Sequence, residues 1–344
     1  MGINPLRLQR CPANPILRPD PASPWQSLVR TNPAVWQDDK TGKIMMLYRA
    51  AGDDPEHRVY FGLAESDDGI AFRACSPDPC FAPSTDGFDA GCVEDPRVVR
   101  LGDWYYVTYA ARAFPPGQYW LKTPTDPFTG PGMPEDAPRC LRLNTTTTGL
   151  ALTKDFKTWI RAGRMTSPVT DDRDVILFPE KVGGRYVMLH RPMEWAGPDY
   201  PNEHPAIWIS YSDDLLDWKE SRLLCQGEAD WEPSKIGGNT PPLRTPHGWL
   251  TIYHAVGPDK KYRLGALLLD LDEPHIVRSR LRDWLLEPME DYEVDGFYPG
   301  VCFPCGKLVR DGKLWVYYGG ADRYVALATC DYNALLEVLH DRYD

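Results

Sequence analysis

LGDWYYVTYA (101–110) decides the fold, because the chain contains five stretches of this kind. Each opens on a turn with Gly or Asp, continues as a run of aromatic and aliphatic residues, and ends in a polar or small group. The other four copies are TGKIMMLYRA (41–50), GGRYVMLHRP (183–192), HGWLTIYHAV (247–256) and DGKLWVYYGG (311–320). A pattern that recurs along a whole chain is the signature of a repeat architecture.

The spacing of the five copies locates an insertion. The residue after the Tyr or His that ends the apolar run of each copy serves as its anchor, and the anchors are Arg49, Ala110, Arg191, His254 and Gly319. Neighbouring anchors are 61 to 65 residues apart, except that 81 residues separate the second from the third. We therefore expect an insertion at about 113–147, a stretch rich in Pro and Gly that ends in NTTTT. Long irregular stretches in compact domains are usually functional or disordered.

Strand-like segments flank every copy. The preceding ones are NPAVW (32–36), EDPRVVR (94–100), LFPEKV (177–182), TPPLRT (240–245) and FPCGKLV (303–309). A third strand follows each copy and often runs into a tight turn and a fourth strand. Five such units predict an all-β, five-bladed β-propeller that forms a single catalytic domain over residues 1–344, closed by a short C-terminal helix in YNALLEVLHDRY (332–343). Two separate sandwiches are the alternative, but they would not need five matching copies.

The composition excludes several classes of partner. The net charge of −11 disfavours nucleic acid and anionic membranes, which both need a basic surface. No stretch approaches the roughly 20 apolar residues that span a bilayer. The nine cysteines are an odd number and scattered, and the N-terminus lacks a secretory leader pattern, so free thiols in a cytoplasmic protein are expected. No His, Cys or Asp set has metal-ligand spacing, so no metal is expected.

The repeat also predicts where a site should form. The first strand of each blade lines the central channel, so polar groups at matching positions should converge at one mouth. Candidates are Asn32, Asp95, Arg173 and Asp174 near the first strands, the anchors Arg49, Arg191 and His254, and Asp322 after the fifth anchor. Such groups could be structural ion pairs between blades. Their clustered cations instead favour a phosphate-like anion, and neither GxxxxGK[ST] nor GxGxxG is present for a nucleotide.

These residues carry a resemblance to a known family. The strings NPAV, LYRA, EDPRVV, LFPEK with MLHRP, SKIG, GWLTIYHAV, YRLGALLLDLDEP, VCFP and YYGGAD resemble glycoside hydrolase family 130. They occur in order from about residue 13 to residue 337, and together they are specific. The resemblance implies an inverting β-mannoside phosphorylase or, less often, a β-mannosidase.

The resemblance also implies roles for individual residues. In the family the Asp of EDPR is the catalytic proton donor, which is Asp95 here, while Glu94 and Arg97 hold that turn. The residues that match those holding the sugar are Asn32, Arg49, Arg173, Asp174 and Asp322. The residues that match the phosphate-binding set are Arg191, Lys235, His254 and Tyr262.

The basic set favours phosphorolysis of a terminal β-mannoside to α-mannose 1-phosphate and a shortened acceptor. Inorganic phosphate would be a co-substrate and no cofactor is expected, because phosphate replaces the water that an inverting hydrolase must activate with a second carboxylate. A β-mannosidase on the same fold and a non-catalytic glycan-binding propeller remain the alternatives. The partner would be a β-mannoside disaccharide or oligosaccharide of open linkage, and a homo-oligomer stays open. Loops 113–147 and 194–205 carry Tyr119, Trp120, Trp195 and Tyr200, which could stack on the acceptor sugar or be buried at a contact between subunits.

Overall fold

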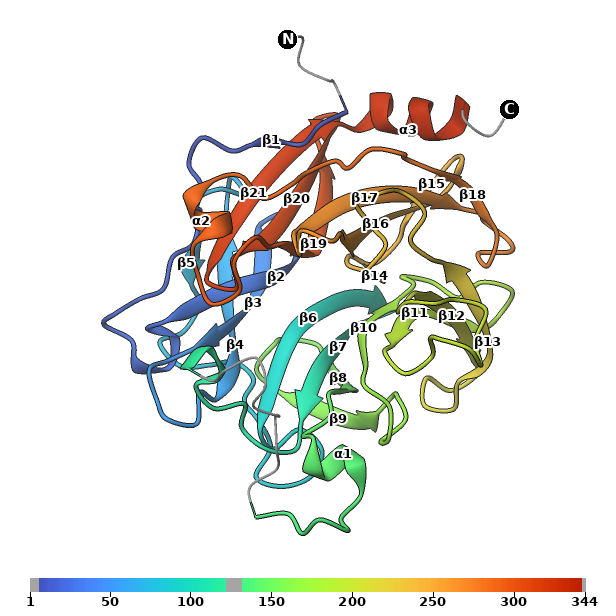
Figure 1. The fold of residues 1–344 in the computed structure, drawn as a ribbon. Coiled ribbons are helices and arrows are strands. Elements are labelled where there is room, and N and C mark those ends of the chain that lie inside the picture. Colours follow the sequence, from blue (N-terminus) through green and yellow to red (C-terminus); the bar gives the residue numbers. More distant parts are fainter. Residues whose placement is uncertain (1–5, 122–131, 342–344) are drawn as a thin grey trace.

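The protein forms a ring of five β-sheet blades around a central axis (Figure 1). The computed structural model describes residues 6–121 and 132–341. Blade 1 consists of β2 (Val29–Gln37), β3 (Ile44–Ala51), β4 (Val59–Ser66) and β5 (Arg73–Ala74), and blade 2 of β6 (Cys92–Leu101), β7 (Trp104–Arg112), β8 (Thr147–Thr153) and β9 (Trp159–Arg164). Blade 3 consists of β10 (Asp172–Leu177), β11 (Tyr186–Pro192), β12 (Ile207–Ser212) and β13 (Lys219–Cys225). Blade 4 consists of β14 (Lys235–Gly238), β15 (Leu243–Thr245), β16 (Gly248–Val256), β17 (Tyr262–Leu269) and β18 (Val277–Arg280).

The last blade is completed by the N-terminal part of the chain. Blade 5 contains β19 (Cys302–Arg310), β20 (Lys313–Gly320) and β21 (Tyr324–Asp331). Its outer strand is β1 (Gln9–Arg10), which pairs antiparallel with β21, and Figure 1 shows β1 lying beside it. The first strand therefore ties the last blade to the first, and the predicted five-bladed propeller is confirmed.

The continuous apolar runs follow from burial of both faces of each blade. Successive side chains of a strand point to opposite faces. In β3, Met46 packs toward blade 5 while Leu47 packs toward blade 2, and in β11 Met188 packs toward blade 2 while Leu189 packs toward blade 4. Each of the five gaps between blades thus contains its own apolar core.

A buried polar cluster recurs in the blades. In blade 4, Tyr253 lies over Gly265, where a Cβ would come within 2.2 Å of the tyrosine ring. The Tyr253 hydroxyl donates to Glu232 at 2.8 Å, and Glu232 pairs with Arg280 of the outer strand at 2.7 Å. Blades 2 and 5 repeat this tyrosine–carboxylate–arginine cluster with Tyr109, Asp89 and Arg161 and with Tyr318, Glu293 and Arg10. The cluster joins the middle strand, the loop before the inner strand and the outer strand of one blade.

Two inner strands differ from the prediction. In blade 3 the inner strand is Asp172–Leu177, so the predicted segment 177–182 is mostly the turn that follows it. In blade 4 the predicted segment 240–245 contains only β15, and the channel strand is β14. Pro241 and Pro242 separate the two pieces, because a proline has no N–H for the strand ladder.

The remaining elements lie outside the ring. The long connection between β7 and β8 includes η2 (Tyr119–Leu121) and α1 (Arg139–Arg142) in its described part, while residues 122–131 lie outside the described range. The short elements η1 (Pro24–Gln26) and α2 (Asp291–Val294) precede blades 1 and 5. The predicted C-terminal helix is α3 (Tyr332–Asp341), which buries Leu335, Leu336 and Leu339 against blades 4 and 5. Among the described residues no helix is long and apolar enough to cross a membrane.

Candidate active site

The five anchors occupy equivalent places in the folded chain. Each pairs with an inner-strand residue of its own blade, and the pairs are Arg49 with Thr31, Ala110 with Glu94, Arg191 with Arg173, His254 with Gly237, and Gly319 with Phe303. The alignment made on the sequence is therefore the structural register of the propeller.

Three inner strands bulge directly after that pair. The bulged residues Asn32, Asp95 and Asp174 have left-handed backbones, with φ of 47°, 53° and 58°. Asn and Asp enter this region more readily than other non-glycine residues. A β-bulge redirects a side chain, and strained backbones of this kind cluster at functional sites. The same device thus supplies a polar group to the mouth from blades 1, 2 and 3.

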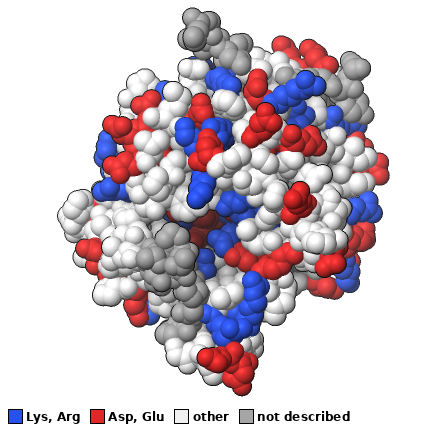
Figure 2. Space-filling view, in the orientation of Figure 1, with Lys and Arg blue, Asp and Glu red and all other residues white. Residues whose placement is uncertain are grey.

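These groups meet in a cavity of about 220 Å³ at the mouth of the channel. Figure 2 shows a hollow in the middle of this face, in which acidic and basic side chains gather. Every residue predicted for the site lines the cavity except His254. The lining residues that the motif reasoning did not assign to the ligands are Glu94, Arg112, Pro116, Tyr119, Tyr298, Val301 and Phe303.

An acidic cluster forms one side of the cavity. Asp95 Oδ1 accepts hydrogen bonds from Asn32 Nδ2 at 2.8 Å and from Arg49 Nη1 at 3.2 Å. The same Arg49 nitrogen lies 3.7 Å from Asp322 and 3.8 Å from Glu94. Asn32 also donates to Asp322 at 3.4 Å. Blades 1, 2 and 5 therefore bring three carboxylates around one guanidinium group.

The pKa values of two carboxyl groups in the acidic cluster shift in opposite directions. Burial raises the pKa of Asp322, and the opposing effect of Arg49 does not cancel this rise. Burial would also raise the pKa of Glu94, but Arg49 and Arg112 outweigh it and leave that pKa below its ordinary value. Asp322 therefore retains its proton more readily than Glu94 does.

A cationic cluster forms the opposite side. Asp174 is buried and accepts from Arg191 Nε at 3.0 Å, while Arg97 lies 3.4 Å from its other oxygen. Burial alone would raise the pKa of Asp174, but the charges of Arg191 and Arg97 lower it far below its ordinary value. Asp174 therefore lies among the phosphate-binding candidates rather than with the acidic cluster, and it fixes the orientation of Arg191.

Lys235 and Tyr262 complete the cationic side. The Lys235 ammonium donates to the Tyr262 hydroxyl and lies 4.6 Å from the ring centre. Burial, together with Arg191 and Arg173, lowers the pKa of Lys235 to about 7. Burial likewise raises the pKa of Tyr262, so its hydroxyl stays protonated. Both side chains can donate hydrogen bonds to a ligand. Because the pKa of Lys235 is about 7, an anionic ligand can shift this side chain to its charged form.

His254 lies behind the cavity. It is fully buried, its Nδ1 contacts Asn239 Oδ1 at 3.1 Å, and its ring stacks on Tyr262 with centroids 5.4 Å apart. Burial lowers the pKa of His254, with help from Arg191 and Lys235, so the imidazole is neutral. Its Nε2 is 3.9 Å from Asp174 and makes no hydrogen bond in the described structure. His254 therefore does not line the cavity itself but packs behind Tyr262 of the cationic side.

Residues of the insertion enter the site through a fixed base. Arg112 donates to the Asn144 carbonyl at 2.6 Å, and the Asn144 side chain bonds both the N–H and the C=O of Phe114 at 3.0 and 2.8 Å. These bonds join the two ends of the insertion and place Pro116 and Tyr119 in the wall of the cavity. Arg112 follows the second anchor by only two residues, which is the signal that could have identified it.

The sequence matches a known protein family over most of its length. A family model described as beta-1,4-mannooligosaccharide phosphorylase matches residues 7–126 and 140–341. The chain belongs to glycoside hydrolase family 130. The resemblance inferred from the motifs is therefore confirmed.

Members of glycoside hydrolase family 130 match over almost the whole chain. A 1,2-beta-oligomannan phosphorylase of Thermoanaerobacter sp. (strain X514) is 33% identical over 94% of this chain and 97% of its own length. A beta-1,4-mannooligosaccharide phosphorylase of Ruminococcus albus is 30% identical over 93% of this chain and 87% of its own length. The solved structure of the beta-1,2-mannobiose phosphorylase from Listeria innocua, in complex with beta-1,2-mannobiose, has a TM-score of 0.78 and 25% identity, covering 99% of this chain and all of that one.

Proposed function

We propose that this protein is a glycoside phosphorylase that cleaves a terminal β-mannoside with inorganic phosphate and inverts the anomeric carbon. The products are α-mannose 1-phosphate and a shortened acceptor. The observation that carries the proposal is the division of one cavity into an acidic side around Asp95 and a cationic side around Arg191 and Lys235. The names of the curated relatives, all mannoside phosphorylases, support the same reaction.

The mechanism uses the two sides in turn. Phosphate held by Arg191, Lys235 and Tyr262 attacks the anomeric carbon from the face opposite the leaving oxygen, because an inverting displacement needs an in-line approach. The new C–O bond forms as the glycosidic C–O bond breaks. Asp95 gives its proton to the departing oxygen, directly or through a hydroxyl of the same mannosyl unit. The carboxyl groups around Arg49, above all Glu94 with its lowered pKa, stabilise positive charge that develops on the sugar ring.

The state of Asp174 supports phosphorolysis over hydrolysis. An inverting hydrolase needs a carboxylate base that activates water opposite the proton donor. Among the described residues that line the cationic side, the carboxylate is Asp174, whose two oxygens are engaged by Arg191 and Arg97. A carboxylate with a strongly lowered pKa is a weak base, so water at this place would not be activated.

The deciding experiment incubates the protein with β-1,2- and β-1,4-mannobiose, with and without inorganic phosphate. We expect α-mannose 1-phosphate and free mannose in equal amounts, and only when phosphate is present. Release of mannose at the same rate without phosphate would establish the β-mannosidase instead. No turnover of any β-mannoside, together with retained glycan binding, would favour the non-catalytic propeller.

The linkage and the acceptor need a separate measurement, because the relatives act on both 1,2- and 1,4-linked mannosides. Phosphate release from α-mannose 1-phosphate with a panel of acceptors identifies them. We also propose that residues 1–344 act as a single catalytic domain, since every blade contributes a side chain to the cavity. The free cysteines, most of them buried, support a cytoplasmic location.

A further inference from the structure

A second and larger hollow lies beside the candidate active site. It has a volume of about 600 Å³ and is bounded by the loop before β6, the base of the insertion, α1 and the ends of β8 and β9. We call it the blade-2 groove. The side chains that matter for the argument are Phe88, Phe114, Leu141, Arg164, Thr147 and Asp86. The reaction described above uses none of them.

The groove and the active-site cavity share one wall. Arg112 and Pro116 line the cavity, whereas Ala113 and Phe114, between them in the sequence, line the groove. The wall is fixed in place, because buried Asn144 bonds both backbone groups of Phe114. The cavity and the groove thus lie on opposite sides of one short stretch of chain, residues 112–116.

The groove opens on the same face of the ring as the cavity. Thr147, in its floor, pairs with Ala111, the residue after the second anchor. All five anchors lie toward the mouth, so this end of blade 2 lies next to it. In Figure 1, α1 lies outward from the centre of the ring, beyond β9 of blade 2, and Pro138 and Leu141 at this helix form the outer side of the groove.

The chemistry of the groove suits a sugar chain. Phe88 and Phe114 are half-buried aromatic rings that line the groove. The electron-rich face of a ring such as Phe114 attracts the C–H groups of a pyranose, whereas the Phe88 ring has a guanidinium group over it that can donate hydrogen bonds to sugar hydroxyls. Arg164 lies 5.3 Å from the centre of the Phe88 ring, and Asp86 is exposed beside it. Apolar surfaces with a few polar groups are typical of small-ligand sites. A purely apolar partner would leave these charged groups without water.

We propose that the blade-2 groove binds the leaving-group end of a β-mannan oligosaccharide, beyond the units held in the cavity. The inference rests on the proposed function. A disaccharide ends before the shared wall, whereas a longer chain crosses it and reaches the two rings. The groove therefore makes the enzyme prefer oligosaccharides over disaccharides.

The test measures kcat/KM with inorganic phosphate for β-linked mannose chains from the disaccharide to the pentasaccharide. We expect the wild type to gain with chain length. Phe88→Leu keeps an apolar side chain but removes the ring, and it should lose about fivefold to tenfold of that gain. Its kcat/KM for the disaccharide should stay within about twofold of the wild type, which shows that the variant is folded. Ile160→Ala, an exposed change on β9, is the matched control and should change nothing.

The outcomes separate the inference from the function. Equal kcat/KM of Phe88→Leu and wild type for every chain length overturns the groove while phosphorolysis stands. A change in molecular mass by light scattering, with the length preference intact, would assign the groove to contact with a second copy and also overturn it. Phosphate-independent cleavage or no cleavage by the wild type overturns the proposed function itself.

Discussion

Asp95 is placed by its backbone as much as by its partners. Its left-handed bulge and the bonds from Asn32 and Arg49 orient one carboxylate oxygen. Asp95→Asn keeps the size and tolerates the same backbone but cannot donate the acid proton. We expect phosphorolysis to fall by about 10²- to 10⁴-fold with an unchanged Tm. Product formation and thermal unfolding, measured on one preparation, check this, and near-normal activity would assign the proton donor elsewhere.

If Lys235 binds phosphate as proposed, we expect that binding to depend on pH. Burial lowers the pKa of Lys235 to about 7, and a bound phosphate anion would favour the charged ammonium, so phosphate binding would take up a proton. As pH rises through about 7, the free enzyme loses this proton and its affinity for phosphate falls. Lys235→Arg stays charged and should remove that part of the pH dependence.

The measurement is KM for phosphate from about pH 6 to pH 9 in the wild type and in Lys235→Arg. The ionisation of phosphate itself affects both proteins equally, so the difference between the two profiles reports Lys235. Parallel profiles would show that Lys235 does not titrate in this range.

Gly237 leaves room for the cationic cluster. A Cβ there would lie 2.6 Å from His254, 2.7 Å from Arg191 Nε and 2.9 Å from Asp174. Gly237→Ala should therefore displace Arg191 and raise KM for phosphate by about 10- to 100-fold. In the adjacent control, Gly238→Ala, the new Cβ meets the end of the Ile176 side chain, so stability should fall while KM for phosphate stays near the wild-type value. Equal effects of the two variants on KM would contradict this account.

At the scale of elements, the tyrosine–carboxylate–arginine clusters stabilise single blades. In blade 5, Arg10 bonds Glu293 at 2.7 and 2.8 Å, and Tyr318 donates to the same carboxylate at 2.6 Å. Arg10→Met leaves a buried carboxylate without its cation, which should cost about 2–3 kcal/mol, less than for a fully buried pair because Arg10 reaches solvent. Denaturant unfolding measures this loss.

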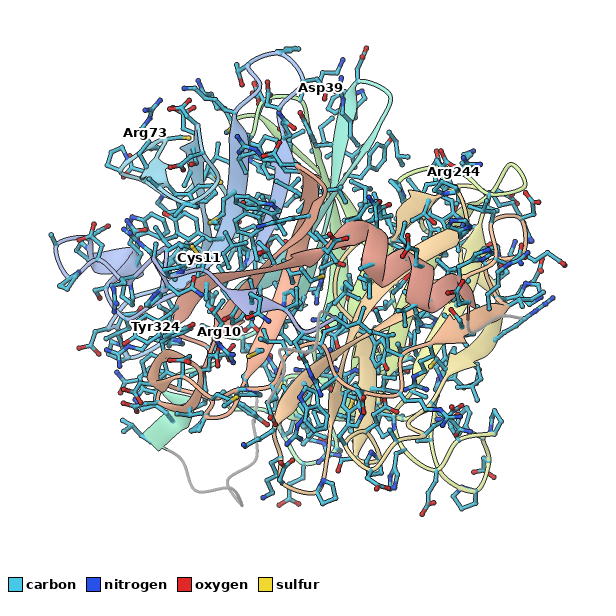
Figure 3. The ribbon with its side chains drawn as sticks, turned by 90° about the horizontal axis from the view of Figure 1, so that it is seen from above. Arg10, Cys11, Asp39, Arg73, Arg244 and Tyr324 are labelled. Carbon is cyan, nitrogen blue, oxygen red and sulfur yellow. The ribbon has the colours of Figure 1, made fainter. Side chains whose placement is uncertain are left out.

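The control uses an exposed pair of the same kind. Arg73 bonds Glu65 at 2.6 and 2.9 Å, and Figure 3 shows Arg73 at the outer edge of the molecule, whereas Arg10 lies on β1. Arg73→Met should leave stability unchanged. Burial would raise the pKa of Glu293, but Arg10 and its other donors hold it below 4.5. The stability that Glu293 contributes through its lowered pKa in the wild type is therefore fully present above its ordinary pKa of 4.5, and it is lost as the pH falls through the lowered pKa of the folded protein.

Most strands could be predicted from the sequence, because burial of both blade faces leaves unbroken apolar runs. The inner strands of blades 3 and 4 could not, since they are short and polar at the mouth. The string KIGG of β14 has too few apolar residues to be recognised as a strand. For β10 and β14, the prediction instead chose the proline-containing segments that follow them, 177–182 and 240–245. The strands that supply polar groups to the site therefore lack the apolar pattern by which a strand is recognised in a sequence.

The same argument applies to the site. Repeat register alone brought together the anchors Arg49 and Arg191 with Asn32, Asp95 and Asp174, and the structure gathers them in one cavity. Tyr119 and Tyr298 come from loops, whose course no periodicity fixes. The placement of His254 behind the cavity also could not be foreseen, because register gives the position of a residue in a blade but not the depth of its side chain.

For the whole molecule, β1 is the element that closes the ring. It adds the outer strand to blade 5 and leads directly into blade 1, and Asn32 of blade 1 lies 3.4 Å from Asp322 at the junction. Deleting residues 1–11 should lower Tm by several degrees and reduce activity as the two blades separate. Asp95→Asn is the comparison, because it should lose activity without losing stability. An unchanged Tm after the deletion would show that the ring closes without β1.

The three left-handed bulges have a consequence for redesign. Asn and Asp have nearly the same shape, and the backbone at Asn32, Asp95 and Asp174 already suits both. Each of these positions can therefore hold either an amide or a carboxylic acid without a change in backbone conformation. Exchanging the two groups, as in Asn32→Asp combined with Asp95→Asn, would move the acid from one blade to the next. The fold of the propeller therefore does not depend on which of these groups carries the acid, and the chemistry of the site can be changed at one bulge at a time.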